Sequence, residues 1–329
     1  MPESDKTCWI ITEGLAGTES QCIGVAEALG VRPAVKRIRL RSPWRQLSPW
    51  LRCGHKYALT PDSDPVEPPY PDILLSSGRK SIGVALYVKK ASGGKTFLVQ
   101  LQDPRINPRH FNLVVVPQHD PTRGDNVLVT TGALHRVTPE KLDTEKMKFE
   151  PRLSPLPHPR VAVLIGGSSK AHRMTAEGSA LLSRQLLALT EKYGAGLMVT
   201  TSRRTGEENV RILKNALGSR EDVFFWGGAG DNPYFAFLGS ADHIIVTEDS
   251  VSMTSEALST GKPVSIAPLE GGAKRLNLFH RMLREQGYTK PFTGSLEIWS
   301  YAPPDDTMKV AAEIERRMKT CPHRTAQES

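Results

Sequence analysis

The chain of 329 residues is poor in cysteine, and its four cysteines form neither a CxxC pair nor a zinc-binding pattern. Disulfide-stabilised and zinc-binding folds are therefore not expected, and reduced cysteines favour a cytosolic compartment. Long hydrophobic runs are also missing, so we expect no membrane-spanning helix. The first residues, MPESDKTCWIITEG, combine acids with an immediate strand pattern, which is unlike a secretory signal. With 39% hydrophobic residues, the chain can still build cores for two domains of ordinary size.

Acidic residues are absent from the stretch 31–61, which holds eight lysines or arginines, running from Arg32 to Lys56. This local excess equals the formal net charge of the whole chain, +8. The stretch also contains Trp44 and Trp50, and basic residues mixed with tryptophan suit an anionic membrane surface. A basic strand followed by a solvated loop with buried tryptophans explains the composition equally well. No nucleic-acid-binding motif accompanies the charge, so nucleic acid is not an expected partner.

Strand and helix patterns alternate along both halves of the chain. Short β-branched runs predict strands, among them 7–12, 72–76, 161–165 and 243–246. Amphipathic stretches that end at glycine predict helices, and the longest of these covers 175–193. This alternation predicts an α/β fold with doubly wound parallel sheets.

A polar, proline-rich stretch, 141–159, separates the two halves. Such a composition is typical of a linker between domains. We therefore expect a first domain over 1–150 and a second over 151–300. The remaining residues, 301–329, are expected to form a C-terminal helix and a short tail.

A glycine-rich turn follows the strand expected over 161–165. The turn consists of Gly166, Gly167, Ser168, Ser169 and Lys170. Glycines let backbone amides approach an anion closely, and a helix end and a lysine add positive potential. The turn matches neither the P-loop nor the GxGxxG pattern, and a tight turn that needs glycine also explains it. Arg203, expected at the end of a neighbouring strand, favours phosphate because arginine can bind phosphate with two hydrogen bonds.

The stretch 242–271 has the pattern of strand, polar turn, helix and strand. Ser250 and Ser252 lie near the turn, between a strand's carboxyl end and a helix's amino end, where open α/β sheets bind ligands. Glu256 lies one turn inside the expected helix 252–260. Its carboxylate could accept hydrogen bonds from a pair of sugar hydroxyls there.

The first half carries a matching turn with Gly14 and Gly17, before a helix that is expected to begin with Thr18 as its N-cap. Asp103 follows a predicted strand and has an arginine beside it, which suits proton acceptance from a hydroxyl. An aspartate that caps a turn is the alternative. His119, at the end of another predicted strand, is a second candidate base, although it is equally explained as a loop residue.

Metal-binding patterns are missing. The DxD of Asp62 and Asp64 lies in a proline-rich loop without an attached strand, so we treat it as chance. The sequence has no HExxH motif, no histidine–cysteine cluster and no GxSxG motif. We therefore expect neither a metal nor a resident cofactor.

Several segments together resemble one known family. They are TEGLAGTESQCIGVAEALG, SSGRKS, QLQDPR, VVVPQHD, VLIGGSSK, TTSRRT and TEDSVSMTSEALSTGKPV. The combination is similar to the family of the plant "elongated mitochondria" fission factor, whose bacterial branch is described as glycosyltransferases. The resemblance covers residues 9–292.

The resemblance implies a GT-B-like architecture, with two Rossmann-like domains that face each other across a cleft and a last helix that returns to the first domain. It implies a nucleotide-sugar donor, bound by the second domain without a metal, whose ribose hydroxyls Glu256 holds. It also implies that the turn from Gly14 to Gly17 faces the donor phosphates and the acceptor. It transfers no catalytic base, so Asp103 and His119 stay as alternatives.

From these patterns we expect a metal-independent glycosyltransferase that moves a sugar from a nucleotide sugar to a cell-envelope or lipid-linked acceptor. The expected location is the cytoplasm, with possible attachment to the inner face of the membrane through 32–56. Two alternatives stay open. One is a non-catalytic adaptor of the mitochondrial-fission type, and the other is a nucleotide-sugar epimerase on the same fold.

Overall fold

The computed structural model describes residues 6–51 and 54–320. Arg52, Cys53, Cys321 and the expected tail after Thr320 lie outside the described residues. The chain divides into two compact units, of which the first combines Met1–Arg136 with Asp305–Ser329 and the second is Val137–Pro304. Among the described residues, no helix has both the length and the apolar character needed to cross a membrane.

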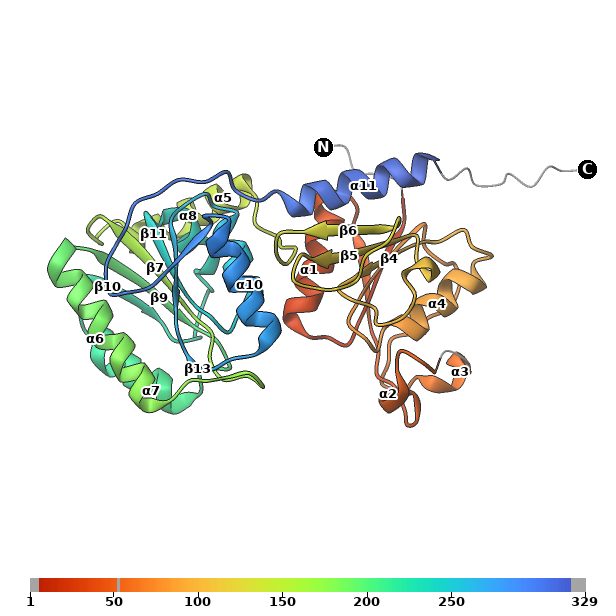
Figure 1. Cartoon of the computed structure of the whole chain (residues 1–329), viewed down its shortest axis with the longest axis horizontal. Coiled ribbons are helices and arrows are strands. Elements are labelled where there is room, and N and C mark those ends of the chain that lie inside the picture. Colours follow the sequence, from red (N-terminus) through yellow and green to blue (C-terminus); the bar gives the residue numbers. More distant parts are fainter. Residues whose placement is uncertain (1–5, 52–53, 321–329) are drawn as a thin grey trace, which may run out of the picture. The chain divides into compact units, whose positions relative to one another are not determined.

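The first unit is built on a parallel sheet with the strand order β2-β1-β3-β4-β5-β6 (Figure 1). Its strands are β1 (Cys8–Thr12), β2 (Pro33–Arg37), β3 (Ile73–Ser77), β4 (Phe97–Leu101), β5 (Leu113–Pro117) and β6 (Val127–Thr130). All neighbouring strands run parallel. The strands β3 and β4 are buried along their whole length, because helices cover both faces of a parallel sheet.

Helices cover this sheet on both faces, namely α1 (Ala16–Ala28), α4 (Ile82–Ala91) and α11 (Asp306–Thr320). The unit also contains the short helices α2 (Trp44–Leu47) and α3 (His55–Ala58) and a 3-10 helix at Pro108–His110. On one face, Val25 of α1 and Ile314 of α11 join the same apolar cluster as Ile10 of β1. On the other face, α4 packs its own cluster. The last helix therefore returns to the first unit, as expected, and Figure 1 shows it lying against this part of the molecule.

The first turn of α11 is held by its own carboxylate. Asp306 accepts hydrogen bonds from the amides of Thr131, at 2.8 Å, and Gly132, at 3.2 Å. Thr307 accepts another from the amide of His135 at 3.2 Å. A carboxylate at a helix N-terminus is also favoured by the helix dipole. Residues that are distant in sequence thus fix where α11 begins.

The second unit is built on another parallel sheet, with the order β10-β9-β7-β11-β12-β14. Its strands are β7 (Arg160–Ile165), β9 (Gly196–Thr201), β10 (Val223–Trp226), β11 (His243–Thr247), β12 (Val264–Ala267) and β14 (Thr289–Pro291). Two short strands, β8 (His172–Arg173) and β13 (Glu270–Gly271), pair antiparallel beside it. In chain order the main sheet reads third, second, first, fourth, fifth, sixth, which is the Rossmann order. The predicted α/β, doubly wound, two-domain fold is confirmed.

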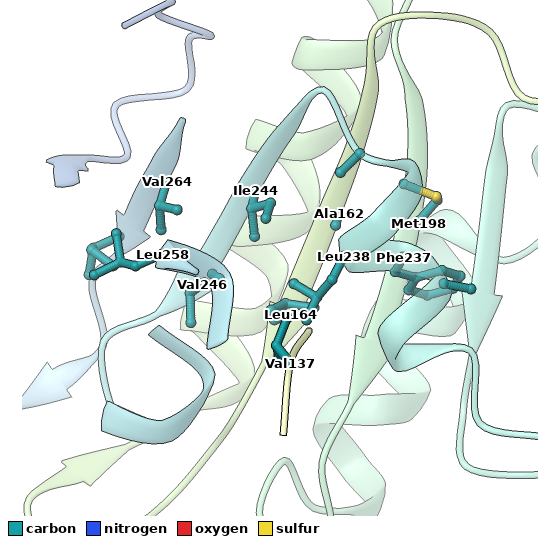
Figure 2. Close-up of a cluster of buried hydrophobic side chains, with 14 of the residues drawn as sticks. Val137, Ala162, Leu164, Met198, Phe237, Leu238, Ile244, Val246, Leu258 and Val264 are labelled. Atoms are coloured by element: carbon teal, nitrogen blue, oxygen red, sulfur yellow. The ribbon is translucent and has the colours of Figure 1, made fainter. Parts of the chain in front are cut away.

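Helices also cover both faces of this second sheet. They are α5 (Pro139–Leu153), α6 (Ala176–Tyr193), α7 (Glu207–Leu217), α8 (Tyr234–Ser240), α9 (Val251–Leu258) and α10 (Lys274–Glu285). The helices α6 and α7 share one apolar cluster, and α5, α8, α9 and α10 share the other. Figure 2 shows part of the second cluster, in which Phe237 and Leu238 of α8 lie over strand residues such as Met198 and Ile244.

The linker expected over 141–159 is wrong, because most of this stretch is α5. Thr138 caps that helix by accepting a hydrogen bond from the amide of Lys141 at 3.2 Å, and a proline occupies its first turn. Pro151 lies in the last turn, two residues before the helix ends at Leu153, so the amide donor that it lacks removes a single hydrogen bond of the helix. Phe149 and Leu153 are buried in the second unit's core. The expected boundary at 150/151 falls inside this helix, whereas the compact units divide at 136/137 and 304/305.

The first helix also begins earlier than expected. Its N-cap is Leu15, which offers no side-chain hydrogen bond, and Gly17 lies in the first helical turn. Thr18 donates a hydrogen bond to the carbonyl of Leu15 at 2.9 Å instead of capping the helix. The expectation that Thr18 is the N-cap is therefore wrong.

Candidate functional site

The topology of the second sheet points to one position, between β7 and β11. These strands are parallel neighbours, and the direction in which the chain adds strands reverses between them. In open α/β sheets the crevice at such a reversal, at the carboxyl ends of the strands, is the usual ligand site. The turn that begins at Gly166 follows β7, and the segment from Glu248 to Glu256 follows β11. The two segments that the sequence singled out therefore meet at the same edge of the sheet.

The backbone amides of the first four residues of the β7 turn already have partners inside the protein. Gly166 donates to the Thr247 hydroxyl at 2.8 Å, and Gly167 donates to the Asp249 carboxylate at 3.1 Å. Ser168 and Ser169 donate to backbone carbonyls at 2.9 and 2.8 Å. In this structure these amides are not free to bind a phosphate, so phosphate binding by them stays a prediction that requires the turn to rearrange.

The glycines of this turn are explained by close packing. A Cβ atom on Gly166 would lie 2.2 Å from an oxygen of Asp249. A Cβ atom on Gly167 would lie 2.1 Å from the carbonyl oxygen of Arg204, and this residue has a positive φ of 144°. Neither position has room for a larger residue.

A buried carboxylate, Asp249, holds the strand ends together. Its side chain has 0% exposure and pairs with the Arg204 guanidinium at 2.7 Å. It also accepts hydrogen bonds from the Thr247 hydroxyl at 2.7 Å and from the Gly167 amide. We call Asp249, Thr247, Gly167 and Arg204 the Asp249 cluster. It ties the ends of β7, β9 and β11 into one unit, and sequence reasoning saw Asp249 only as part of a polar turn.

The other predicted phosphate-binding side chains of this edge are on the surface. Ser168 and Ser169 are exposed, and their hydroxyls accept hydrogen bonds from nearby backbone amides. Lys170 and Arg203 are also exposed, and the structure gives neither an ion-pair partner among the described residues. Two cations thus stand beside the Asp249 cluster without local neutralisation.

The helix α9 begins at the same edge. Ser250 is its N-cap and accepts a hydrogen bond from the Met253 amide at 3.2 Å, which takes up the hydroxyl that was predicted to bind a ligand. Ser252, in the first turn, is half-buried. The start of α9 thus combines a capped helix terminus with one further hydroxyl.

Glu256 lies in α9, as expected, and has a partner that the sequence did not reveal. The hydroxyl of Tyr234, at the start of α8, donates a hydrogen bond to Glu256 Oε2. Burial raises the pKa of the Glu256 carboxyl to about 7, against the hydrogen bond from Tyr234 and the charge of Lys141, which lower it. Burial and the neighbouring carboxylate raise the pKa of the Tyr234 hydroxyl, which therefore stays protonated and donates. This carboxyl is thus held at one oxygen and can gain or lose a proton near neutral pH.

Two buried histidines near the end of β11 were also missed. His280 of α10 has a ring nitrogen, Nε2, 2.7 Å from the carbonyl oxygen of Glu248. His172 of β8 has Nε2 at 3.6 Å from Glu248 Oε1. Burial is the largest cause that lowers the pKa of His280, so this ring is neutral and its Nε2 donates to the carbonyl. The histidines brace the segment that follows β11, and only their three-dimensional contacts reveal them.

The corresponding turn of the first unit follows β1, next to the reversal between β1 and β3. Gly14 has a positive φ of 81°, and its amide donates to Thr12 of the same strand at 3.2 Å. Gly17 lies inside α1. Across the reversal, Glu13 pairs with Lys80 at 2.5 Å, with both side chains partly exposed. This edge therefore has an ion pair where the second unit has a buried cluster.

Asp103 lies after β4 in a turn with unusual backbone geometry. Its Oδ1 accepts hydrogen bonds from the Arg105 amide and the Thr122 hydroxyl, both at 2.8 Å. Gln102 and Arg105 have positive φ values of 73° and 56°. Residues other than glycine rarely adopt this conformation, and such strain gathers at functional sites. Asp103 is half-buried and keeps access to solvent.

His119 and its neighbour Asp120 lie after β5, the strand next to β4. Both side chains are buried, and His119 Nε2 lies 3.8 Å from Asp120 Oδ1. The loops after β4 and β5 are joined by the hydrogen bond between Thr122 and Asp103. The structure therefore brings both candidate bases to one edge of the first sheet, with His119 the less accessible. Among the described residues, no three His, Cys, Asp or Glu side chains are grouped to hold a metal ion.

Solved structures with a similar fold act on, or bind, uridine nucleotides. The UDP-GlcNAc 2-epimerase of Methanocaldococcus jannaschii superposes with a TM-score of 0.51 and 12% identity, over 93% of this chain and 91% of that one. The Staphylococcus aureus MnaA–UDP co-structure gives a TM-score of 0.52 and 13% identity, over 95% and 89%. At this identity the likeness establishes the shared fold.

Sequence comparison gives the family. The mitochondrial fission protein ELM1 of Arabidopsis thaliana is 28% identical over 387 aligned residues, covering 94% of this chain and 90% of the plant protein. An uncharacterized protein of Rickettsia prowazekii is 27% identical over 289, covering 76% and 80%. The profile described as "Mitochondrial fission ELM1" matches residues 16–318. The chain therefore belongs to the mitochondrial fission ELM1 family.

Proposed function

We propose that the chain is a glycosyltransferase that binds a nucleotide-sugar donor on its second unit and needs no metal. The observation that carries the proposal is Glu256, a half-buried carboxyl held by Tyr234 at one oxygen, beside the reversal of the second sheet. Its second oxygen can accept a ribose hydroxyl. The proposal is supported by the Rossmann strand order and by similarly folded proteins whose structures contain UDP.

The exposed cations suit the diphosphate of such a donor. Lys170 and Arg203 flank the Asp249 cluster without ion-pair partners among the described residues, so they can neutralise the charge that builds up on a departing diphosphate. The buried Asp249 carboxylate repels phosphate at short range. We therefore place the phosphates at these side chains, outside the glycine turn itself.

For the catalytic base, we favour Asp103 over His119. A base must reach the acceptor hydroxyl, and Asp103 is half-buried whereas His119 is buried. Hydrogen bonds from the Arg105 amide and the Thr122 hydroxyl also hold its carboxylate in place. The acceptor, proposed to be a cell-envelope or lipid-linked glycan, would give up its proton to this carboxylate.

Ligand-induced stabilisation tests the donor site. We expect one nucleoside diphosphate, or its sugar, to raise the thermal midpoint of the protein and of the control Glu208→Ala, which removes an exposed carboxylate from α7. Glu256→Ala should weaken binding at least about 10-fold and so reduce the shift. The 2′-deoxy nucleotide should bind the unaltered protein about 10-fold more weakly, because a hydrogen bond to a carboxylate is lost. In Glu256→Ala, removal of the 2′ hydroxyl from the nucleotide should cause no further loss of affinity.

Product analysis separates glycosyl transfer from the alternatives. Epimerisation or hydrolysis consumes the nucleotide sugar without any acceptor, whereas a transferase requires one. Asp103→Asn should then lower turnover strongly and leave donor binding intact. Membership of the ELM1 family supports the remaining alternative, a non-catalytic adaptor. Absence of any midpoint shift with UDP, GDP or their sugars would favour the adaptor and end the enzyme proposal.

A further inference from the structure

Large apolar side chains project from a small helical segment of the first unit. We call the described residues 40–51 and 54–59 the α2–α3 segment, because they contain these two short helices. Leu47 is 49% exposed, Trp50 60% and Tyr57 72%. They lie within eleven residues of the chain. The surface of a soluble protein seldom exposes several large apolar side chains together unless they contact a partner.

The segment is folded, so the exposure of these side chains is not the result of a loose loop. Leu40 and Leu59 form an antiparallel bridge at its base, and the Arg41 amide donates to the carbonyl of Ala58 at 2.8 Å. Ser48 is buried and donates its hydroxyl hydrogen bond to the carbonyl of Arg79 at 2.9 Å. The polar Ser48 thus faces inward, while its neighbours Leu47 and Trp50 face solvent.

The two tryptophans of the segment differ in their surroundings. Trp44 is half-buried and packs on Gly54, where an added Cβ atom would lie 3.0 Å from the indole ring. Trp50 is exposed, and it is the only exposed tryptophan of the five in the chain. One indole therefore stabilises the segment, and the other is available to a partner.

The arginines also differ in their partners according to their position. Nearer the sheet, Arg37 pairs with Glu19, and Arg39 pairs with Asp62. Arg41 and Arg45, which lie in the α2–α3 segment, are exposed and have no ion-pair partner among the described residues. Arg41 and Arg45 thus leave positive charge without an ion pair beside the projecting apolar side chains.

We propose that the α2–α3 segment docks the protein on the surface of an anionic lipid bilayer. Tryptophan, tyrosine and leucine enter the boundary between headgroups and acyl chains, and unpaired arginines bind the anionic headgroups. The absence of acids between residues 31 and 61 removes any repulsion from that surface. The inference stands on this segment alone and does not depend on the donor site.

Vesicle binding by the full chain tests the docking surface. We expect binding to vesicles that contain phosphatidylglycerol, and little to vesicles of phosphatidylcholine alone. Arg41→Gln with Arg45→Gln should weaken binding about 25-fold, from about 5-fold per charge. The control, Arg211→Gln with Lys214→Gln, removes two exposed charges from α7 and should change binding less than about 2-fold if the arginines of the segment make the contact.

Fluorescence shows whether Trp50 enters the bilayer. Acyl chains that carry bromine should quench the emission of the bound protein. Trp50→Phe should keep the affinity and lose the quenching, whereas Leu47→Gln with Trp50→Gln should lose both. Unchanged quenching in Trp50→Phe overturns the inference, as does an unbound starting protein or an equal loss in the α7 control. If Leu47→Gln with Trp50→Gln instead converts a dimer into a monomer in sedimentation, the segment is an interface between two copies.

Discussion

In each sheet the first strand in the chain, β1 or β7, is followed by a glycine-containing turn. The two turns are similar in sequence and differ in their hydrogen bonds and ion pairs. After β1, Gly14 bonds within its own strand end, and the reversal of the sheet is bridged by the partly exposed pair Glu13–Lys80. After β7, the amides of Gly166 to Ser169 are occupied, and the fully buried Asp249 side chain joins the ends of three strands. The same local pattern thus gives an adaptable edge in the first unit and a rigid edge in the second.

In the proposed donor site, this difference would separate the residues that hold the edge from the residues that contact the donor. The Asp249 carboxylate is taken up by Gly167, Thr247 and Arg204, so the role of the cluster is to hold β7, β9 and β11 in register at their carboxyl ends. The residues with unused capacity, Glu256, Lys170 and Arg203, stand around it. A rigid edge beside side chains with free hydrogen-bonding capacity is the arrangement that preorganised binding requires.

The largest expected effect comes from removing the carboxylate of the rigid edge. Asp249→Ala leaves the Gly167 amide and the Thr247 hydroxyl without their acceptor and Arg204 without its counter-ion. We expect a loss of about 3–5 kcal/mol in the free energy of unfolding, measured with urea. Glu13→Ala, which breaks the matching pair of the first unit, should cost less than about 1 kcal/mol. Equal costs would mean that the two edges do not differ in rigidity.

The next effect is a contrast in pH dependence between the units. Burial raises the pKa of Glu256 from 4.5 to about 7, so the folded state holds a proton that the unfolded state releases. Stability should therefore fall as pH rises from about 4.5 to about 7. The glutamine in Glu256→Gln cannot ionise. The difference in the free energy of unfolding between this variant and the unaltered protein should therefore grow in favour of the variant across this window, toward about 3 kcal/mol.

Glu313 of α11 is the counterpart with the opposite sign. Hydrogen bonds from Arg316 and Arg317 lower its pKa from 4.5 to about 2. Its contribution is present above pH 4.5 and is lost as pH falls toward 2, so Glu313→Gln should be destabilising at neutral pH and nearly neutral at pH 2. Urea midpoints between pH 2 and 8 measure both effects. Parallel slopes for the two variants would contradict the assignment.

A smaller effect sharpens the comparison of the glycines. Gly166→Ala places a Cβ atom on Asp249 and should cost about 2–3 kcal/mol by overpacking. Gly14→Ala meets its nearest neighbour only at 3.5 Å, and its positive φ should cost about 1 kcal/mol. In a protein that already carries Asp249→Ala, adding Gly166→Ala should cost much less in the free energy of unfolding. Additivity in that double variant would show that the contact with Asp249 is not the cause.

The strands were predictable because their pattern is local. Runs such as 161–165 and 243–246 are β-branched, short and bounded by polar turns, and the structure has strands there. The prediction of a linker over 141–159 was wrong. The prolines suggested an irregular chain, whereas Phe149 and Leu153, four residues apart, lie on the helix face that packs against the core. Pro151 lies close to the end of the helix and does not prevent the helix from forming.

The places of the candidate site residues in the fold followed from local patterns, and their contacts did not. Glu256 followed from its place in a helix after a buried strand, but Tyr234 and Asp249 act through neighbours that are set by sheet order. The third-second-first-fourth order places β7 beside β11, and no periodicity of one segment encodes that. Arg203 was chosen from two adjacent arginines, and the ion pair uses the other, Arg204. One sequence alone does not distinguish such neighbours.

The return of α11 to the first unit also sets an order of events during synthesis. The second unit is one continuous stretch, Val137–Pro304, and all of it leaves the ribosome before the first unit is complete. Until Val310 and Ile314 arrive, the apolar face around Ile10 and Val25 lacks its cover. The part of the chain that is made first therefore finishes folding last, and a truncation near residue 300 should yield a protein that folds its second half and aggregates through its first.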